Sequence, residues 1–251
     1  MPVMRDLVLL LSALTVWVGG VAQGGEWTVE PAKAAPAFPF FAYRSFLPEH
    51  DAMRRFAEKA DVNVVTLFPA NTYNLLGFPY CAYPQNWTWW GTIDEKVIDR
   101  QFDEVIAVNP KVRFICLVDL NTPMWMYRRL GFQGYDSFCG LSNALCSDKW
   151  RMETEAYLRL FLAHVESRYA DRMLGYVLAC GRTTEWIDYS NWHASPEKTE
   201  KWNAWRQAKG LEPAPVPSFE RIRQASFDNL IRDPSREQDV LDYAAFSNEI
   251  V

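Results

Sequence analysis

The sequence predicts an α/β protein of the (β/α)8-barrel (TIM-barrel) type, with only the first four strand-and-helix units present. Short apolar segments of strand length alternate four times with longer segments of helical periodicity. Polar and aromatic residues follow each apolar segment, as they do at the carboxyl ends of strands in α/β folds, where ligands bind. The 251 residues, 49% of them hydrophobic, are enough for one large core.

The first 37 residues precede this pattern. Residues 1–24 have the features of a signal peptide: a positive charge at Arg5, an apolar run over 7–18 and small residues around Gly24. Residues 25–37 are rich in Pro and Ala and are interpreted as a lead-in arm, which leaves 38–251 for the barrel. We therefore expect a secreted or periplasmic protein without an integral membrane span after cleavage, since a span needs about 20 apolar residues. An uncleaved anchor is the alternative.

The first two units occupy the segment up to residue 108. We expect a strand over 38–46, a helix over 48–59, a strand over 62–68, a long aromatic loop over 72–90 and a helix over 94–108. In the first helix Met53, Phe56 and Ala57 share one face, as a helix packed on a sheet requires.

The next two units contain the clearest helix of the sequence. A strand is expected over 112–120, and a second long loop leads to a helix over 150–169 that Ser147 and Asp148 can cap. The fourth strand, Gly175 to Cys180, is apolar and uncharged.

The pattern changes after Tyr189. Helical segments are expected over 191–209 and 219–231, and an amphipathic helix begins at Asp239. A helix after the fourth strand leaves four strands of a barrel unaccounted for. We therefore interpret the chain as the amino-terminal half of a larger barrel.

Glu185 is the candidate catalytic carboxyl group, because it lies just beyond the fourth strand among polar and aromatic residues. An ion pair or a cap is the alternative role for it. Candidate substrate-binding residues stand at the ends of all four strands: Tyr43, Arg44, Asn71, Asp119, Asn121, Trp125, Arg182, Thr184 and Trp186. Asp119 and Asn121 could equally cap loops, Trp125 and Trp186 could pack over the sheet, and Arg182 could pair with Asp188 or Glu185.

Several classes of partner are not expected. The 26 basic and 31 acidic residues form no long run of one sign, so the sequence carries no electrostatic pattern for nucleic acid. The three histidines are scattered, and we expect neither a metal site nor a cofactor. Homo-oligomerisation is left open.

The five cysteines and one sequon allow predictions about burial, disulfide formation and glycosylation. Cys116 and Cys180 lie in apolar strands and are expected to be buried, whereas Cys139 and Cys146 flank a polar loop and could form a disulfide. Asn86, in Asn-Trp-Thr, is a glycosylation site only if the host glycosylates.

Several short motifs occur in a characteristic order. They are Asn121-Thr122-Pro123-Met124-Trp125, Gly175-Tyr176, Glu185-Trp186, Arg232-Asp233-Pro234 and Asp242-Tyr243. In this order they resemble the catalytic barrel of family 42 glycoside hydrolases and related β-galactosidase-like proteins, over about Phe38 to Val251.

The resemblance implies a retaining O-glycosyl hydrolase that cleaves a β-linked glycan with two carboxyl groups. Glu185 matches the general acid/base, and the nucleophile would lie on a later strand that these 251 residues do not contain. The family usually has Asn before the acid, whereas this chain has Thr184, whose hydroxyl cannot donate and accept in the geometry of an amide. The alternative is a catalytically incomplete fragment or a half-barrel that binds carbohydrate. Eleven Trp and eleven Tyr suit contacts with sugar faces.

Overall fold

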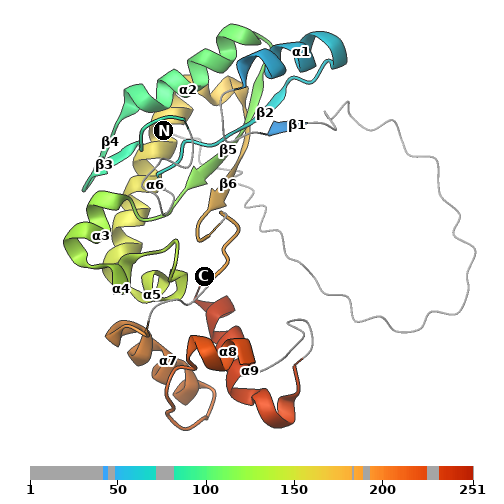
Figure 1. Ribbon diagram of the computed structural model, residues 1–251. Helices are drawn as coiled ribbons and strands as arrows, with labels where there is room; N and C mark the ends of the chain where they lie inside the picture. Colours follow the sequence, from blue (N-terminus) through green and yellow to red (C-terminus); the bar gives the residue numbers. More distant parts are fainter. Residues whose placement is uncertain are drawn as a thin grey trace, which may run out of the picture. The chain divides into compact units, whose positions relative to one another are not determined.

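The computed structural model (Figure 1) describes residues 42–44, 49–71, 82–182, 184–188, 193–224 and 232–250. All of them belong to one unit, Pro39–Val251. The expected signal peptide and lead-in arm lie outside the described residues.

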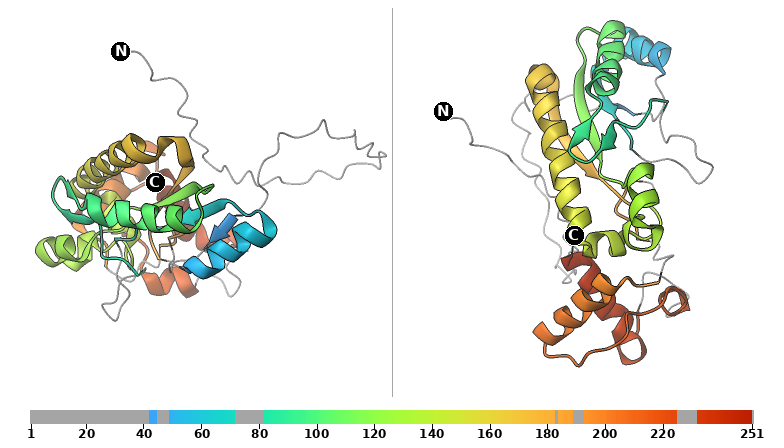
Figure 2. Two further views of the ribbon diagram at one scale, coloured as in Figure 1. Left: turned by 90° about the horizontal axis from the view of Figure 1, so that it is seen from above. Right: turned by 90° about the vertical axis from the view of Figure 1, so that its left-hand side faces the viewer.

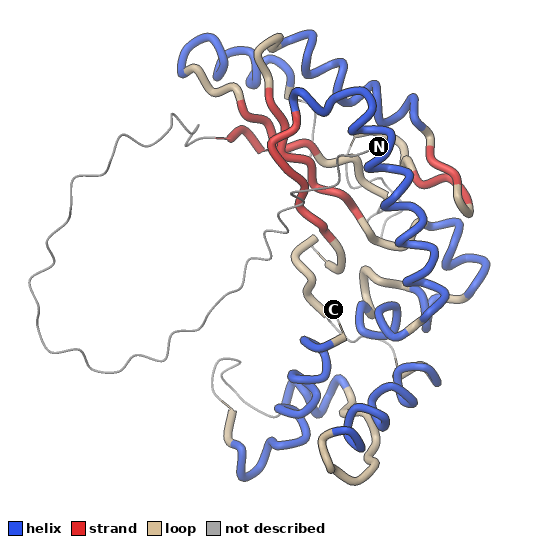
Figure 3. The backbone as a smooth tube through the Cα atoms, turned by 180° about the vertical axis from the view of Figure 1, so that it is seen from behind, coloured by secondary structure: helices blue, strands red, loops and turns tan. Residues whose placement is uncertain are grey.

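Four parallel strands form the main sheet, in the order β1-β2-β5-β6. Their bounds are Ala42–Arg44 for β1, Val64–Leu67 for β2, Arg113–Asp119 for β5 and Met173–Ala179 for β6. Figure 3 shows these strands in red. Strands next to each other in the sheet follow one another in the chain and run the same way, so their carboxyl ends lie along one edge.

The predicted (β/α)8 barrel is wrong. The main sheet is open, with β1 and β6 as its two edges among the described residues, and a separate antiparallel hairpin is formed by β3 (Trp87–Trp89) and β4 (Thr92–Ile93). A barrel requires its last strand to pair with its first, with a defined tilt and stagger. Alternating strands and helices specify parallel neighbours, but they do not specify closure.

One face of the sheet carries the main hydrophobic core. The longest helices that contribute to it are α1 (His50–Ala60), α2 (Glu95–Val108) and α6 (Asp148–Tyr169), seen in two further views in Figure 2. Alternate residues of β5, such as Phe114 and Cys116, enter this core, whereas Leu117 enters a smaller cluster. The predicted cap of α6 is confirmed, because Ser147 Oγ accepts a hydrogen bond from Trp150 N at 3.3 Å.

The predicted loop between β5 and α6 contains short helices. These are α3 (Met124–Leu130), α4 (Phe132–Tyr135) and α5 (Leu141–Cys146), and a 3-10 turn, η1 (Ala170–Arg172), joins α6 to β6. Gly131, with φ of 101°, ends α3. Helices this short lack the long periodic pattern that identifies a helix in sequence.

Three further helices follow the sheet: α7 (Pro196–Ala208), α8 (Phe219–Gln224) and α9 (Pro234–Glu249). Trp202, Tyr243 and Phe246 form a separate cluster with Cys146 of α5. The last helix begins earlier than predicted, because the Asp233 side chain accepts from Ser235 N at 3.0 Å and Pro234 suits the first turn.

The cysteines are thiols in the described part of the chain. Cys116 and Cys180 are buried, as predicted. Cys139 and Cys146 are also free thiols, so the disulfide considered for this pair does not form.

Candidate functional site

The carboxyl edge of the sheet is organised around Asp119, the last residue of β5. Its side chain is fully buried, at 0% exposure. Its carboxylate accepts hydrogen bonds from Asn71 N at 2.6 Å, from Asn121 N at 3.0 Å and from Asn121 Nδ2 at 2.9 Å. In return, Asn71 Nδ2 donates to the Asp119 carbonyl at 2.9 Å. Asp119 therefore joins the loops that follow β2 and β5.

Asn121 extends these contacts to the end of β6. Its Oδ1 accepts from Gly181 N at 2.9 Å and from Ser137 Oγ at 2.9 Å, and its Nδ2 lies 3.2 Å from the Gly181 carbonyl. The chain leaving β6 is thus held to β5 by a side-chain amide that pairs with both backbone groups of Gly181.

Asn86 and Tyr157 complete the buried arrangement. Asn71 Oδ1 accepts from Trp87 N at 2.8 Å, Asn86 Nδ2 donates to the Pro69 carbonyl at 3.0 Å, and Tyr157 Oη donates to Asn86 Oδ1 at 2.9 Å. Burial raises the pKa of Tyr157 well above its usual value, so the hydroxyl keeps its proton. Because Asn86 is 0% exposed, its sequon is closed to glycosylation in the folded chain.

We call Asn71, Asn86, Asp119 and Asn121 the edge network. The sequence predicted sugar contacts for three of them, and the structure does bring these three together. Their polar atoms bind protein groups in a region closed to solvent. For Asp119 and Asn121 this arrangement matches the alternative role, that of fixing loops.

The turn over 181–188, of which the structure describes every residue except Thr183, follows β6 and is held to the edge network by Asn121. Gly181 has φ of 73°, and an added Cβ would lie 3.0 Å from the Ile187 carbonyl oxygen. Thr184 and Trp186 also have positive φ, at 67° and 60°. Such a conformation costs a non-glycine residue about 1 kcal/mol or more and persists only where its surroundings hold it.

Backbone hydrogen bonds hold this turn closed. Trp186 N donates to the Cys180 carbonyl at 2.8 Å, and Arg182 pairs with Ile187 in an antiparallel bridge. Trp186 Nε1 donates to the Leu178 carbonyl at 2.8 Å, and its ring packs against the main core. These contacts are those of a packing residue, the alternative role considered for Trp186.

Glu185 lies at the tip of the turn, and its side chain is exposed. The residue before it, Thr184, is buried, and Arg182 is half-buried. Burial raises the pKa of the Cys180 thiol far above its usual value, so this thiol at the start of the turn stays uncharged. The turn thus presents a carboxyl group to solvent from a backbone fixed on both sides.

A second anchor holds the far end of the turn. Asp188 Oδ2 lies 3.2 Å from the hydroxyl of Tyr243 in α9, and that hydroxyl is 2.7 Å from Lys198 Nζ in α7. Lys198, only 2% exposed, also donates to Ser142 Oγ of α5 at 2.7 Å. No pattern in the sequence indicates this contact, because Lys198 lies in a helix of polar composition and is brought to Tyr243 and Ser142 only by tertiary packing.

The remaining candidates lie elsewhere. Tyr43 and Arg44 belong to β1, beside β2, and their side chains are outside the described part of the structure. Trp125 is the second residue of α3, and its Nε1 donates to the Trp87 carbonyl at 2.8 Å. Its ring contacts are with tryptophans of the β3–β4 hairpin, so the structure assigns it to that cluster.

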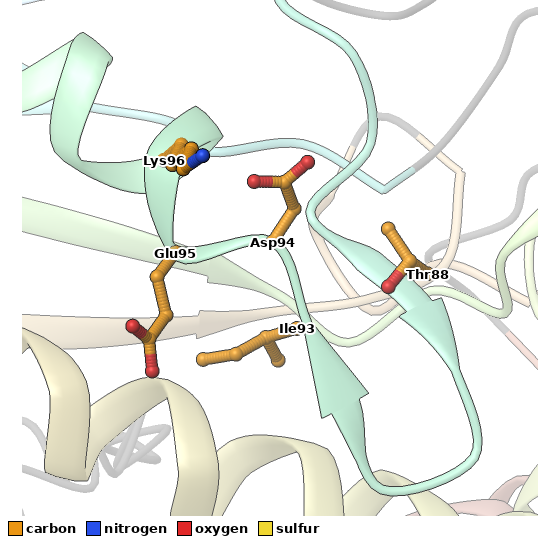
Figure 4. Close-up of a pocket in the computed structure, with 5 residues that line it drawn as sticks. All are labelled: Thr88, Ile93, Asp94, Glu95 and Lys96. Carbon is orange, nitrogen blue, oxygen red and sulfur yellow. The ribbon is translucent and has the colours of Figure 1, made fainter.

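A hollow of about 420 Å³ lies at the hairpin and the start of α2 (Figure 4). It is lined by Thr88, Ile93, Asp94, Glu95 and Lys96 and by none of the described residues of the turn over 181–188. Asp94 caps α2 through Val97 N at 3.2 Å, and Glu95 lies 3.7 Å from His164 Nδ1. Both carboxylates have structural partners, so the hollow is not a convincing catalytic site.

Within the described ranges, no cluster of His, Cys, Asp or Glu side chains suits a metal ion. None of the helices described there is long and apolar enough to span a membrane. Comparison of the sequence with models of protein families and with curated proteins gives no match.

Proposed function

We propose that the chain is a secreted O-glycosyl hydrolase of the β-galactosidase-like, retaining kind, in which Glu185 is the general acid/base. One observation carries the proposal: an exposed carboxyl group stands on a strained, doubly anchored turn at the carboxyl edge of a parallel sheet. Strain in non-glycine residues concentrates at functional sites, and this edge is where ligands bind in α/β folds.

The chemistry assigned to Glu185 is proton transfer at the glycosidic oxygen. The carboxyl group donates its proton as the bond to the leaving group breaks, and the resulting carboxylate later accepts a proton from the attacking water. The rigid turn favours this role, because a fixed backbone limits the positions that the carboxyl group can take.

Retention requires a second carboxylate about 5–5.5 Å from the first. Asp119 does not suit this role, because its carboxylate is buried and already accepts three hydrogen bonds. We assign the nucleophile to none of the described carboxylates.

Carbohydrate binding without hydrolysis is the second candidate. It is favoured by Trp89 of the β3–β4 hairpin, whose side chain is 41% exposed although its neighbour Trp87 is buried. An exposed indole offers an apolar face to a sugar ring.

The test is Glu185→Gln, assayed on two β-glycosides of the same sugar. One has a poor, alkyl leaving group, and the other has an activated aryl leaving group that departs without a proton. We expect the variant to lower kcat by about 10² to 10⁴-fold on the alkyl glycoside, and much less on the aryl glycoside. Glu212→Gln, at another exposed glutamate, is the matched control and should act as the parent does.

Equal activity of Glu185→Gln and the parent on both glycosides would remove Glu185 from the mechanism. Binding of glycans by a parent chain that hydrolyses neither substrate would favour the second candidate.

A further inference from the structure

The β3–β4 hairpin and α3 together form an aromatic surface that the turn does not use. We define the tryptophan platform as Trp89, Trp90 and Trp125. The ring centroid of Trp125 lies 5.1 Å from that of Trp89 and 4.6 Å from that of Trp90. Beneath them, Trp87 is buried and stacks on Tyr157 of α6 at 4.6 Å. The tryptophan platform is therefore attached to the main core through Trp87 and Tyr157.

Two cationic side chains lie over this platform. The guanidinium carbon of Arg129 is 4.4 Å from the centre of the Trp89 ring, and Lys149 Nζ is 4.5 Å from that of Trp90. Lys149 also has a carboxylate 3.5 Å away, on Glu153. Arg129 is exposed, and no ion pair of its guanidinium is found among the residues that the structure describes.

In this geometry the guanidinium of Arg129 can bind an anion. A guanidinium over an indole is held by the ring's negative face, while its N–H groups point outward in its own plane. Those N–H groups match the two oxygens of a carboxylate or sulfate. Trp89 remains 41% exposed with this charge at its ring, so one ligand unit can contact both side chains.

We propose that Trp89 and Arg129, supported by Trp125, bind a sugar unit that carries a negative charge, such as a uronic acid or a sulfated pyranose. The apolar face of the sugar ring packs on the exposed indole, and its anionic group accepts the N–H groups of Arg129. The inference rests on the proposed function only for the choice of carbohydrate as ligand, and it does not involve Glu185.

The other anionic ligand that combines with aromatic and arginine side chains is single-stranded nucleic acid. Such binding uses a groove of positive charge along the strand, whereas this chain has a net charge of -5 and no basic run. A single arginine on an aromatic surface suits a single anionic unit better.

Calorimetric titration of the whole chain with an oligogalacturonate tests the inference, and its neutral methyl ester is the comparison ligand. We expect the ester to bind about tenfold or more weakly, and Arg129→Gln to weaken binding of the acid similarly, as loss of a charge-assisted hydrogen bond implies. Arg128→Gln, at the exposed neighbouring arginine, is the matched control and should leave affinity unchanged. A sulfated oligosaccharide in a parallel titration shows which anionic group binds more tightly.

Four results would overturn the inference: unchanged affinity in Arg129→Gln, equal loss in Arg128→Gln, equal binding of acid and ester, or no binding of either anionic sugar. Tighter binding of a single-stranded oligonucleotide would do so as well. Glu185→Gln should bind the acid as the parent does, so failure of the hydrolase proposal and failure of this one are separate outcomes.

Discussion

The edge network and the turn over 181–188 lie at the same edge of the sheet, yet they differ in what their carboxyl groups do. Asp119 is 0% exposed and accepts three hydrogen bonds from protein groups. Glu185 is exposed at the tip of a strained turn. Position at a strand's carboxyl end therefore does not by itself indicate ligand binding, because some residues there fix the loops that present the others.

The conformation of the exposed turn depends on the buried edge network. Asn121 binds both backbone groups of Gly181, the first residue of the turn. A turn with two non-glycine residues at positive φ needs such support, because each of these residues adopts a conformation that costs about 1 kcal/mol or more. Substitutions in the edge network should thus reduce stability, and substitutions at the tip should reduce activity alone.

The largest expected effect is that of Asp119→Ala. The substitution leaves Asn71 N and the two Asn121 donors without their acceptor, and each unsatisfied buried donor costs about 1–3 kcal/mol. We expect the free energy of unfolding to fall by about 3–5 kcal/mol, since partial entry of water reduces the sum. Denaturant unfolding measures it.

Asp171→Ala, at an exposed aspartate before β6, is the control and should change stability by less than about 0.5 kcal/mol. A loss below about 1 kcal/mol in Asp119→Ala would show that the edge network does not stabilise the loops at the carboxyl edge of the sheet. Asp119 and Glu185 would then not differ in their contributions to stability.

The sequence predicted those helices and strands that have a long hydrophobic pattern or a recognisable helix cap. The helix over 148–169 follows from its period and from Ser147, and β2, β5 and β6 follow from apolar runs close to their observed bounds. The barrel was wrong because closure depends on pairing between distant strands, which no local pattern specifies. The hairpin at Trp87 and helix α5 were missed because each is too short to show a period.

The candidate site was predictable only in part. Parallel strands place Asn71, Asp119 and Asn121 at one edge, and the sequence pattern was sufficient to group them. Whether a polar side chain there faces solvent or a neighbouring loop depends on packing from residues far away in the chain. Lys198 and Tyr243 illustrate this, because the Tyr243 hydroxyl contacts both Lys198 and Asp188 although Lys198 and Tyr243 lie 45 positions apart in the chain.

An intermediate effect is expected from pH at Cys180, where the network meets the turn. Burial raises the pKa of this thiol in the folded chain, so the folded state keeps a proton that the unfolded chain releases above about pH 8.5. A raised pKa means that stability is present at lower pH and is lost as pH rises. One thiol contributes at most about 1.4 kcal/mol of loss per pH unit above that point.

We therefore expect Cys180→Ala to lose less stability than the parent between pH 8 and pH 10, by about 2 kcal/mol. Urea unfolding across this pH range gives the slope of the free energy of unfolding against pH for Cys180→Ala and for the parent. Asp171→Ala should have the same slope as the parent. Identical slopes for Cys180→Ala and the parent would mean that solvent reaches the thiol and that the strand end beneath the turn is open.

The smallest effect on stability is expected at Glu185 itself. An exposed side chain at the tip of a turn contributes little, so Glu185→Gln should change the free energy of unfolding by less than about 0.5 kcal/mol. Thermal and denaturant unfolding of variant and parent should coincide. A loss above about 1 kcal/mol would mean that the carboxylate holds the turn together, as an ion pair or a cap would. In that case a displaced turn would be enough to reduce hydrolysis by the same variant. Loss of activity would then not show that Glu185 transfers the proton.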